Sequence, residues 1–147
     1  MGLESIAEQG VKTAFRVFTD TLGPDDNPVY RCFLLDDETE SGDKKEEREY
    51  PLVQITASPN WPTFHQSIFR EIPVEIKWAT HASADPKRAK LLALYDGCRA
   101  ILDAGLTSIT VTGYSVTGVI IEQGGESGVE DNEQYMTLPV TIKVCGA

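Results

Sequence analysis

The sequence predicts an α+β fold in which two helices pack on a mostly antiparallel sheet that ends in a long C-terminal β-hairpin. Apolar residues recur at helical spacing near the N-terminus and again after residue 85, whereas they alternate with polar residues over 72–80 and 135–145. At 147 residues the chain has the length of one domain with its own core. We therefore expect one domain over residues 1–147, with acidic loops at about 36–50 and 122–134.

The first helix is predicted from about residue 5 to residue 21. Ser5-Ile6-Ala7-Glu8 has the form of a capping box, and Gly23-Pro24-Asp25-Asp26 ends the helix. Its apolar positions at helical spacing are Val11, Phe15, Phe18 and Leu22. Short strands are then predicted at 29–35 (VYRCFLL) and 52–57 (LVQITA), and SPNWPTFHQS, with two prolines, is expected to be a connection.

The stretch from Ile72 to Thr80 alternates strictly and predicts a strand with one face on a core. The inward residues are Ile72, Val74, Ile76 and Trp78, and the outward residues are Glu71, Pro73, Glu75 and Lys77. Asp85-Pro86 has the form of a helix start, and the helix is expected to end near Gly105. Its apolar stripe comprises Leu91, Leu94, Tyr95, Cys98, Ile101 and Leu102.

The last two strands are predicted to form a long hairpin. In ITVTGYSVTGVII the inward parity shifts after Gly113 and again after Gly118, as bulges require. The inward pairs are Ile109 with Val111, Tyr114 with Val116, and Val119 with Ile121. The return strand YMTLPVTIKVC places Met136, Leu138, Val140, Ile142 and Val144 on one face, and Pro139 in it favours an edge or a bulge.

The excess negative charge is confined to two segments. The chain has 23 acidic and 13 basic residues, a net charge of −10. Asp36 to Glu49 holds eight acids and three bases, and Glu122 to Glu133 holds five acids and no base, so each segment has a net charge of −5 and the remainder is balanced. Sequence-specific binding of nucleic acid is not expected, because readers of nucleic acid carry a basic stripe.

No motif predicts catalysis, a cofactor or a metal. GGESG (124–128) lacks the Lys-Ser or Lys-Thr and the following helix of a phosphate loop. Oxygen ligands for calcium are present at Glu126, Glu130, Asp131 and Glu133, but their spacing does not follow a calcium loop. His65 and His81 have no nucleophile motif nearby. The three cysteines, Cys32, Cys98 and Cys145, are far apart, which favours reduced buried thiols and leaves an intersubunit disulfide open.

Several side chains are candidates for contacts with partners. Lys87, Arg88 and Lys90 lie in the first turns of the second helix, where the helix dipole disfavours cations, so they form either a solvated face or a contact to an acidic partner. Trp61 and Phe64 are either core residues or apolar contacts. The second acidic segment, which contains Glu122, Glu126, Glu130, Asp131 and Glu133, is either a solvated spacer or a functional loop.

Three stretches of the chain carry a resemblance to a known family. The stretches that carry the resemblance are YPLVQITASPNW, IPVEIKWATHASADPKRAKLLALYDGCRAIL and the closing LPVTIKVC. In the order of its elements and in its hydrophobic pattern, the chain resembles the tail terminator (tail-completion) proteins of tailed bacteriophages. The helices and strands predicted over roughly the whole chain follow the same order as in that family. It implies a compact α+β subunit without catalytic residues or a cofactor.

The resemblance also implies a structural role in the virion. Such proteins form a ring, commonly of six copies, that caps the tail tube, stops its elongation and joins the head-completion proteins, while DNA later passes through the lumen without specific binding. The acidic loops are then expected to line the channel or to contact neighbouring subunits and the tube. The alternatives are a neck or head–tail connector subunit, a small-molecule-binding α+β domain, and a metal-dependent enzyme.

The sequence also predicts where the protein is made. It contains no run of eighteen apolar residues, and MGLESIAEQGVKTAF lacks the basic start and apolar centre of a signal peptide. We therefore expect a soluble protein without a membrane partner, made in the host cytoplasm and incorporated into the tail or neck of the virion.

Overall fold

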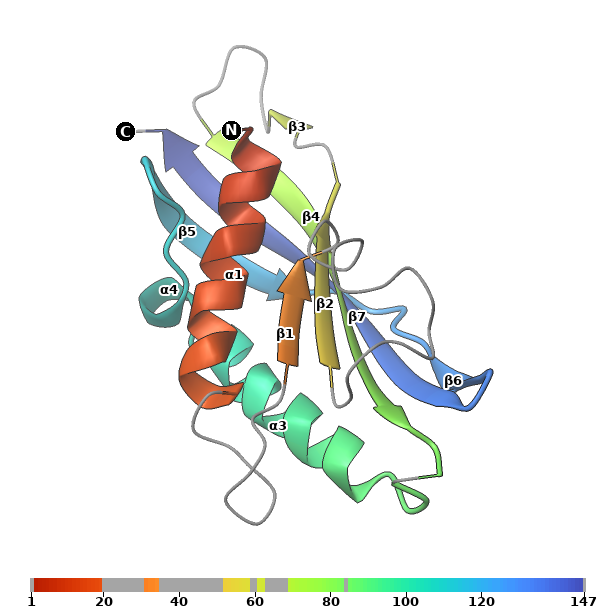
Figure 1. Cartoon of the computed structure of the whole chain (residues 1–147). Coiled ribbons are helices and arrows are strands. Elements are labelled where there is room, and N and C mark those ends of the chain that lie inside the picture. The colour runs from red at the N-terminus through yellow and green to blue at the C-terminus, as the bar shows by residue number, and fades with distance from the viewer. Residues whose placement is uncertain are drawn as a thin grey trace.

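The computed structural model describes residues 2–19, 31–34, 52–58, 61–62, 69–83 and 85–146, with the main chain alone at 16–19, 31–34, 52 and 61–62. Figure 1 shows the order of the elements. The helices are α1 (Leu3–Thr19), α3 (Ala89–Asp103) and α4 (Gly105–Ser108). The strands are β1 (Arg31–Leu34), β2 (Leu52–Ala57), β3 (Trp61–Pro62), β4 (Phe69–His81), β5 (Tyr114–Ile121), β6 (Ser127–Glu130) and β7 (Glu133–Gly146). The predicted acidic loop at 36–50, together with His65 and Phe64, lies outside the described residues.

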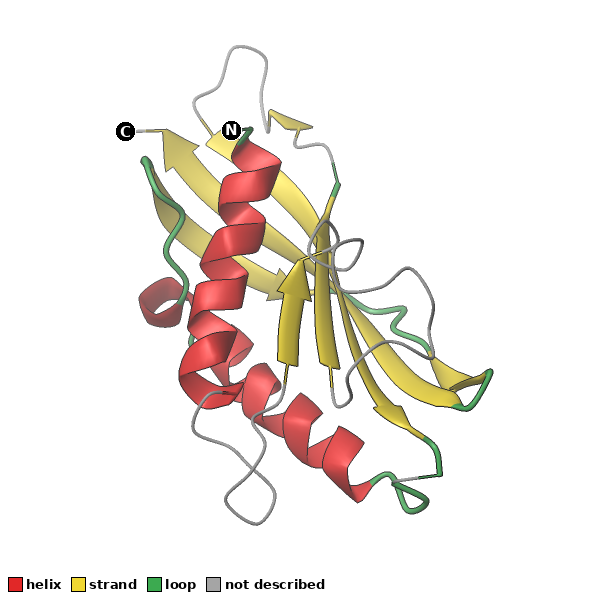
Figure 2. Cartoon of the chain, in the orientation of Figure 1, coloured by secondary structure: helices red, strands yellow, loops and turns green. Residues whose placement is uncertain are grey.

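The strands form one mostly antiparallel sheet. Its main order is β1-β2-β4-β7-β5, with β3 paired to β4 and β6 paired to β7, and only β1 and β2 run parallel. The helices lie across one face of this sheet (Figure 2). The α+β class, the two main helices and the long C-terminal hairpin are thereby confirmed.

The core lies between this face of the sheet and the helices. The predicted alternation along β4 is confirmed, because Ile72, Val74, Ile76 and Trp78 are buried and the intervening residues from Glu71 to Lys77 are not. The Trp78 ring lies 5.0 Å from that of Tyr95 on α3, edge to face, and 6.4 Å from that of Phe15 on α1. One tryptophan therefore contacts both helices from the centre of the sheet.

The stripe predicted on the second helix is also confirmed. Leu91, Leu94, Cys98 and Leu102 are buried on α3, and Tyr95 and Ile101 pack against the same core. Burial raises the pKa of the Cys98 thiol to about 12, and the opposing effect of the Trp78 side chain is smaller. Cys98 is therefore a neutral core residue at physiological pH.

The capping-box prediction for α1 is wrong. The helix begins at Leu3, so Ser5 and Glu8 lie inside it. The Glu8 carboxylate accepts a hydrogen bond of 2.7 Å from the main-chain nitrogen of Ala57, at the end of β2. This carboxylate binds the sheet because α1 lies across it, and a local sequence motif does not encode that contact.

The hairpin prediction is correct in its pairing and wrong in two details. The bulge at Gly118 is confirmed by a register shift between Val116 and Gly118. The first strand, however, begins at Tyr114, so Ile109 and Val111 are buried in the connection that precedes it. Pro139 lies in an interior strand, opposite the segment that separates β5 from β6, and its carbonyl accepts the Glu122 N–H at 2.9 Å.

Close approach of α1 to the connection before β5 requires a glycine at position 10. A Cβ added there would overlap the Thr110 carbonyl oxygen. We expect Gly10→Ala to lower the free energy of unfolding by about 1–3 kcal/mol, as overpacking does, although alanine is the better helix former. Urea denaturation measures the effect.

The exposed neighbour Gln9 gives the matched control. Gln9→Ala should change the stability by less than about 0.5 kcal/mol. A Gly10→Ala variant as stable as the parent would show that the helix can move away from Thr110.

Candidate functional site

The second acidic segment folds as an extension of the hairpin, which we name the acidic arm (residues 122–133). It was predicted to be a loop, and this is corrected: β6 pairs with the first part of β7, from Ser127 opposite Met136 to Glu130 opposite Glu133. The connecting residues Asp131 and Asn132 have φ of 50° and 66°, as a tight two-residue hairpin turn requires. The Asp-Asn pair before an alternating strand is the signal that could have predicted this turn.

Hydrogen bonds also hold the part of the arm that precedes β6, residues 122–126, to β7. Thr137 N donates to the Glu126 carbonyl at 2.7 Å, and Thr137 Oγ1 accepts from Glu126 N at 2.9 Å. Thr141 Oγ1 donates to the Glu122 carboxylate at 3.0 Å. Figure 1 shows β6 and the start of β7 reaching beyond α1 at the right of the view. The arm is therefore a structured projection of the sheet.

The five acids of the arm differ in their surroundings. Glu122, Glu126, Glu130 and Asp131 are exposed, whereas Glu133 is only 2% exposed and lies in β7. Its carboxylate forms an ion pair of 2.6 Å with Lys77, whose ammonium also lies 5.4 Å from the centre of the Tyr135 ring. Glu133 is therefore part of the packing of the sheet, and the exposed charge comes from the other four acids.

A buried polar cluster lies next to the turn of the arm. It consists of Thr80 at the end of β4, Asp85 before α3, and Gln134 on β7, each at most 4% exposed. The Gln134 amide donates to the Asp85 carbonyl at 2.6 Å and lies 3.0 Å from Thr80 Oγ1. Thr80 Oγ1 donates to Asp85 Oδ2 at 3.2 Å. Sequence reasoning missed this cluster, because its members are up to 54 residues apart.

Asp85 also fixes the start of α3, but not where the sequence predicted it. The helix begins at Ala89, after a turn at Pro86 and Lys87. The Asp85 carboxylate accepts the main-chain N–H groups of Lys90 at 3.1 Å and Leu91 at 3.0 Å. Arg88, the residue directly before the helix, has a φ of 59° and so adopts the left-handed conformation. The aspartate is thus a cap that acts across a turn.

The predicted basic residues follow a loop that lies beside the turn of the acidic arm. Ala82 N donates to the Asn132 carbonyl at 2.8 Å, and this places the loop before α3 beside the turn of the arm. Among the residues that the structure describes, Lys87, Arg88 and Lys90 have no ion-pair partner. The structure does not bring Trp61 to this site, because its main chain pairs with Glu71 near the other end of β4.

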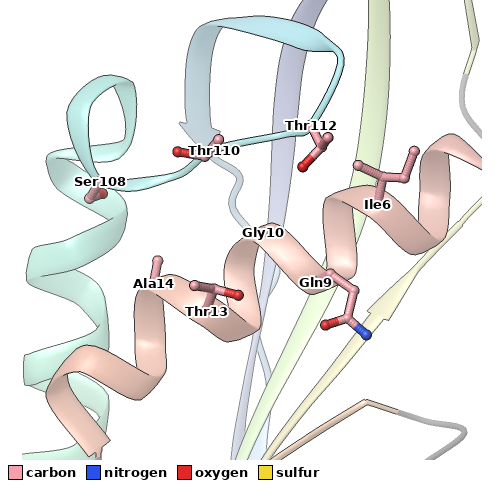
Figure 3. Close-up of a pocket in the computed structure, with 8 residues that line it drawn as sticks. All are labelled: Ile6, Gln9, Gly10, Thr13, Ala14, Ser108, Thr110 and Thr112. Atoms are coloured by element: carbon pink, nitrogen blue, oxygen red, sulfur yellow. The ribbon is translucent and has the colours of Figure 1, made fainter.

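A groove of about 540 Å³ lies between α1 and the connection before β5 (Figure 3). Its lining consists of hydroxyl, amide and small side chains with one isoleucine: Ile6, Gln9, Gly10, Thr13, Ala14, Ser108, Thr110 and Thr112. Binding sites for small molecules are usually lined by hydrophobic and aromatic residues with a few convergent polar groups. The groove has no aromatic or charged side chain, so it does not favour the small-molecule alternative.

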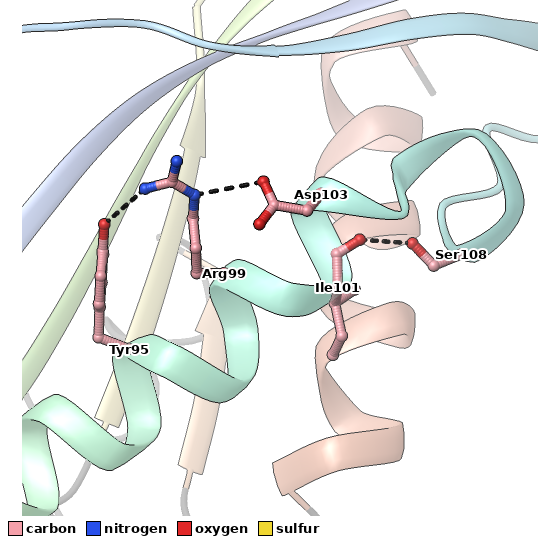
Figure 4. A network of polar contacts seen from close by, with 5 residues as sticks. All are labelled: Tyr95, Arg99, Ile101, Asp103 and Ser108. Atoms are coloured by element: carbon pink, nitrogen blue, oxygen red, sulfur yellow. Dashed lines mark hydrogen bonds and ion pairs between the residues drawn. The ribbon is translucent and has the colours of Figure 1, made fainter.

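A surface network follows α3 toward α4 (Figure 4). Arg99 donates to the Tyr95 hydroxyl at 3.0 Å and forms an ion pair of 3.4 Å with Asp103. The hydrogen bond with Tyr95, and to a smaller extent Asp103, raises the pKa of Arg99 above its ordinary value. Such exposed pairs stabilise helices by only a few tenths of a kcal/mol, roughly. Ser108 Oγ donates to the Ile101 carbonyl at 2.7 Å and joins α4 to the end of α3.

Comparisons with known proteins do not assign the chain. No protein-family model matches it, and the search of curated proteins found no significant match. Among the described residues, no group of three or more histidine, cysteine, aspartate or glutamate side chains is placed to hold a metal ion. None of the described helices is long and apolar enough to cross a membrane.

Removing the Asp85 carboxylate should destabilise the fold. Asp85→Ala takes away the acceptor of two helix N–H groups and of the Thr80 hydroxyl, in a buried position. We expect the free energy of unfolding to fall by about 2–4 kcal/mol, from a lost helix cap and unsatisfied buried donors together. Urea denaturation measures it.

Asp96→Ala is the matched control, because Asp96 is an exposed carboxylate on α3, the helix that Asp85 caps. It should change the stability by less than about 0.5 kcal/mol. An Asp85→Ala variant equal to this control would mean that the cluster contributes no net stability.

Proposed function

We propose that the chain is a tail terminator of a tailed bacteriophage. In this proposal, copies of the chain form a ring that caps the tail tube, stops its elongation and provides the surface for joining the head. The resemblance implies six copies in the ring. Its partners are further copies of itself, the tail tube protein and a head-completion protein, and DNA passes through the lumen without specific binding. The protein is then a structural component of the virion.

The observation that carries this proposal is the acidic arm. Four exposed acids lie on the arm, which is held in place by its pairing with β7 and by the buried cluster next to its turn. Acidic walls repel phosphate, so a channel lined by such side chains lets DNA pass without retaining it. A fixed projection, unlike a free loop, keeps these charges at a constant place in a ring.

The positions of the similar stretches give further support. IPVEIKWATHASADPKRAKLLALYDGCRAIL forms most of β4 and α3, and LPVTIKVC forms most of β7. The two strands pair along their length, and α3 contributes to the core that covers their inner face. The resemblance therefore concerns segments that are in contact in the fold.

Electron microscopy of particles assembled with and without the chain tests the proposal. We expect overlong tubes and headless tails in its absence, and tubes of normal length joined to heads when it is added back. Tubes of normal length that fail to join heads would assign the chain to the neck or connector instead. Wholly normal particles without the chain would refute both assignments.

The arm is tested by a triple variant, Glu126→Gln, Glu130→Gln and Asp131→Asn, which leaves the buried Glu133 intact. Asparagine is chosen at position 131 because it tolerates the positive φ there. We expect normal tube length and head joining, but slower DNA ejection, because the lumen then repels phosphate less. Ejection is followed by release of DNA from purified particles.

The control is Glu75→Gln, Asp96→Asn and Asp103→Asn, which removes the same charge from exposed positions outside the arm. This control should eject DNA at the parental rate. Failure of assembly in the arm variant alone would make the arm a docking element, and an arm variant with parental assembly and ejection would exclude both roles.

A further inference from the structure

The outer edge of β5 has no strand partner among the described residues. β5 pairs with β7 on one side, and among the described strands nothing pairs with its other side. None of its eight residues is buried, and the strand YSVTGVII contains no charge and no proline. At roughly 3.3 Å per residue the edge is about 26 Å long.

Proteins that remain monomeric usually protect such an edge. Charged side chains, proline and coverage by another element are the common means, because unpaired N–H and C=O groups form a template for another strand. Here the adjoining surface is apolar instead. Ile120 on β5 is 40% exposed, and Leu106 on α4, which contacts β5, is 63% exposed. The edge is therefore open to an extended segment of another chain.

The opposite end of the sheet carries a strand of the matching direction. β1 is parallel to β2, and each further step through β4, β7 and β5 is antiparallel. It follows that β1 and β5 run in opposite directions. When a second copy is placed beside the first in the same orientation, its β1 meets β5 as an antiparallel neighbour, which is the more stable pairing.

The β5 side of this contact carries no charge. Residues 104–121, which include α4 and β5, contain no charged side chain. An incoming strand therefore meets no acid on this side, which matters in a chain of net charge −10.

We infer that the β5 edge of one copy pairs with the β1 edge of the next, so that the sheet continues from subunit to subunit. This contact is heterologous, since it joins two different surfaces, and such contacts produce rings when they close. The inference rests on the proposed function for the closed ring and identifies the surface that forms it. A two-fold contact of β5 with β5 would instead stop at a dimer.

Disulfide cross-linking of the full chain tests the pairing, with the native Cys32 on β1 as one partner. Cysteine is introduced singly at Ser115, Thr117 or Ile120 of β5, in a Cys145→Ser background because Cys145 is the cross-strand neighbour of Ser115. We expect at least one variant to give a ladder longer than two chains on oxidation. Cys32→Ser should abolish that ladder.

Two outcomes would overturn the inference. Dimers that survive Cys32→Ser would assign the edge to two-fold pairing of β5. If none of the three positions gives a cross-link, the β5–β1 contact is excluded. This holds whether the concentrated protein sediments as an oligomer or as a monomer.

A charge variant gives an independent readout. Ser115→Lys with Ile120→Lys protects the edge in the way that natural edge strands are protected. We expect it to lose the oligomer in sedimentation velocity while retaining the parental melting temperature. The control Ala93→Lys with Ala100→Lys adds the same charge at exposed positions of α3 and should retain the oligomer. An oligomer that persists in the β5 variant would overturn the inference.

These results are separable from those on tube length. Rings that persist in the β5 variant and still terminate tubes would refute the edge contact alone. Cross-linked rings that leave tube length unchanged would refute the terminator proposal alone.

Discussion

The pairing of β4 with β7 is the constraint on which the rest of the structure depends. Thirteen consecutive residue pairs join the two strands, from Phe69 opposite Cys145 to His81 opposite Glu133. Because side chains alternate along a strand, this single register decides the face of every residue in the centre of the sheet. A slip of one position would turn Trp78 to the outer face and Lys77 toward the core. The contacts of α1 and α3 with Trp78 therefore presuppose the register.

The polar residues at one end of this pair have a second structural effect. Thr80 and Gln134 are inward residues of adjacent strands that lie beyond the apolar part of the core, where they contact Asp85. Buried polar groups must be hydrogen-bonded, and here each supplies the partner of another. The same contacts fix the start of α3 and the turn end of the acidic arm. The position of this helix and that of the charged hairpin thus depend on one set of hydrogen bonds.

The parts of the fold that the sequence predicted are those with a repeating pattern. The alternation in β4 and β7 and the stripe on α3 are properties of neighbouring residues, and burial by the rest of the chain reinforces them. The incorrect predictions concern residues whose contacts are made with a partner far away in the sequence. Glu8 binds Ala57 instead of capping its own helix, and Asp85 caps α3 from beyond a turn. β6 has only Val129 as an apolar residue and exists through its pairing with β7. The sequence places five acids together in one segment, and four of them are exposed in the structure. The fifth, Glu133, is buried because it pairs with Lys77, 56 residues earlier in the chain.

The distribution of charge bears on how an acidic chain can associate with itself. Between unit charges in water, repulsion is screened over about 8 Å at physiological ionic strength, so it matters mainly where acids approach closely. The β5 edge has no charge, while the acids that follow it are displaced onto the arm. Hydrogen bonds between strand edges are short-ranged and directional, and they form only where two main chains meet. A neutral edge beside an acidic arm is therefore compatible with close contact between copies at the edge. In the proposed ring, an acidic edge would oppose assembly, and a neutral arm would leave the channel without a repulsive lining.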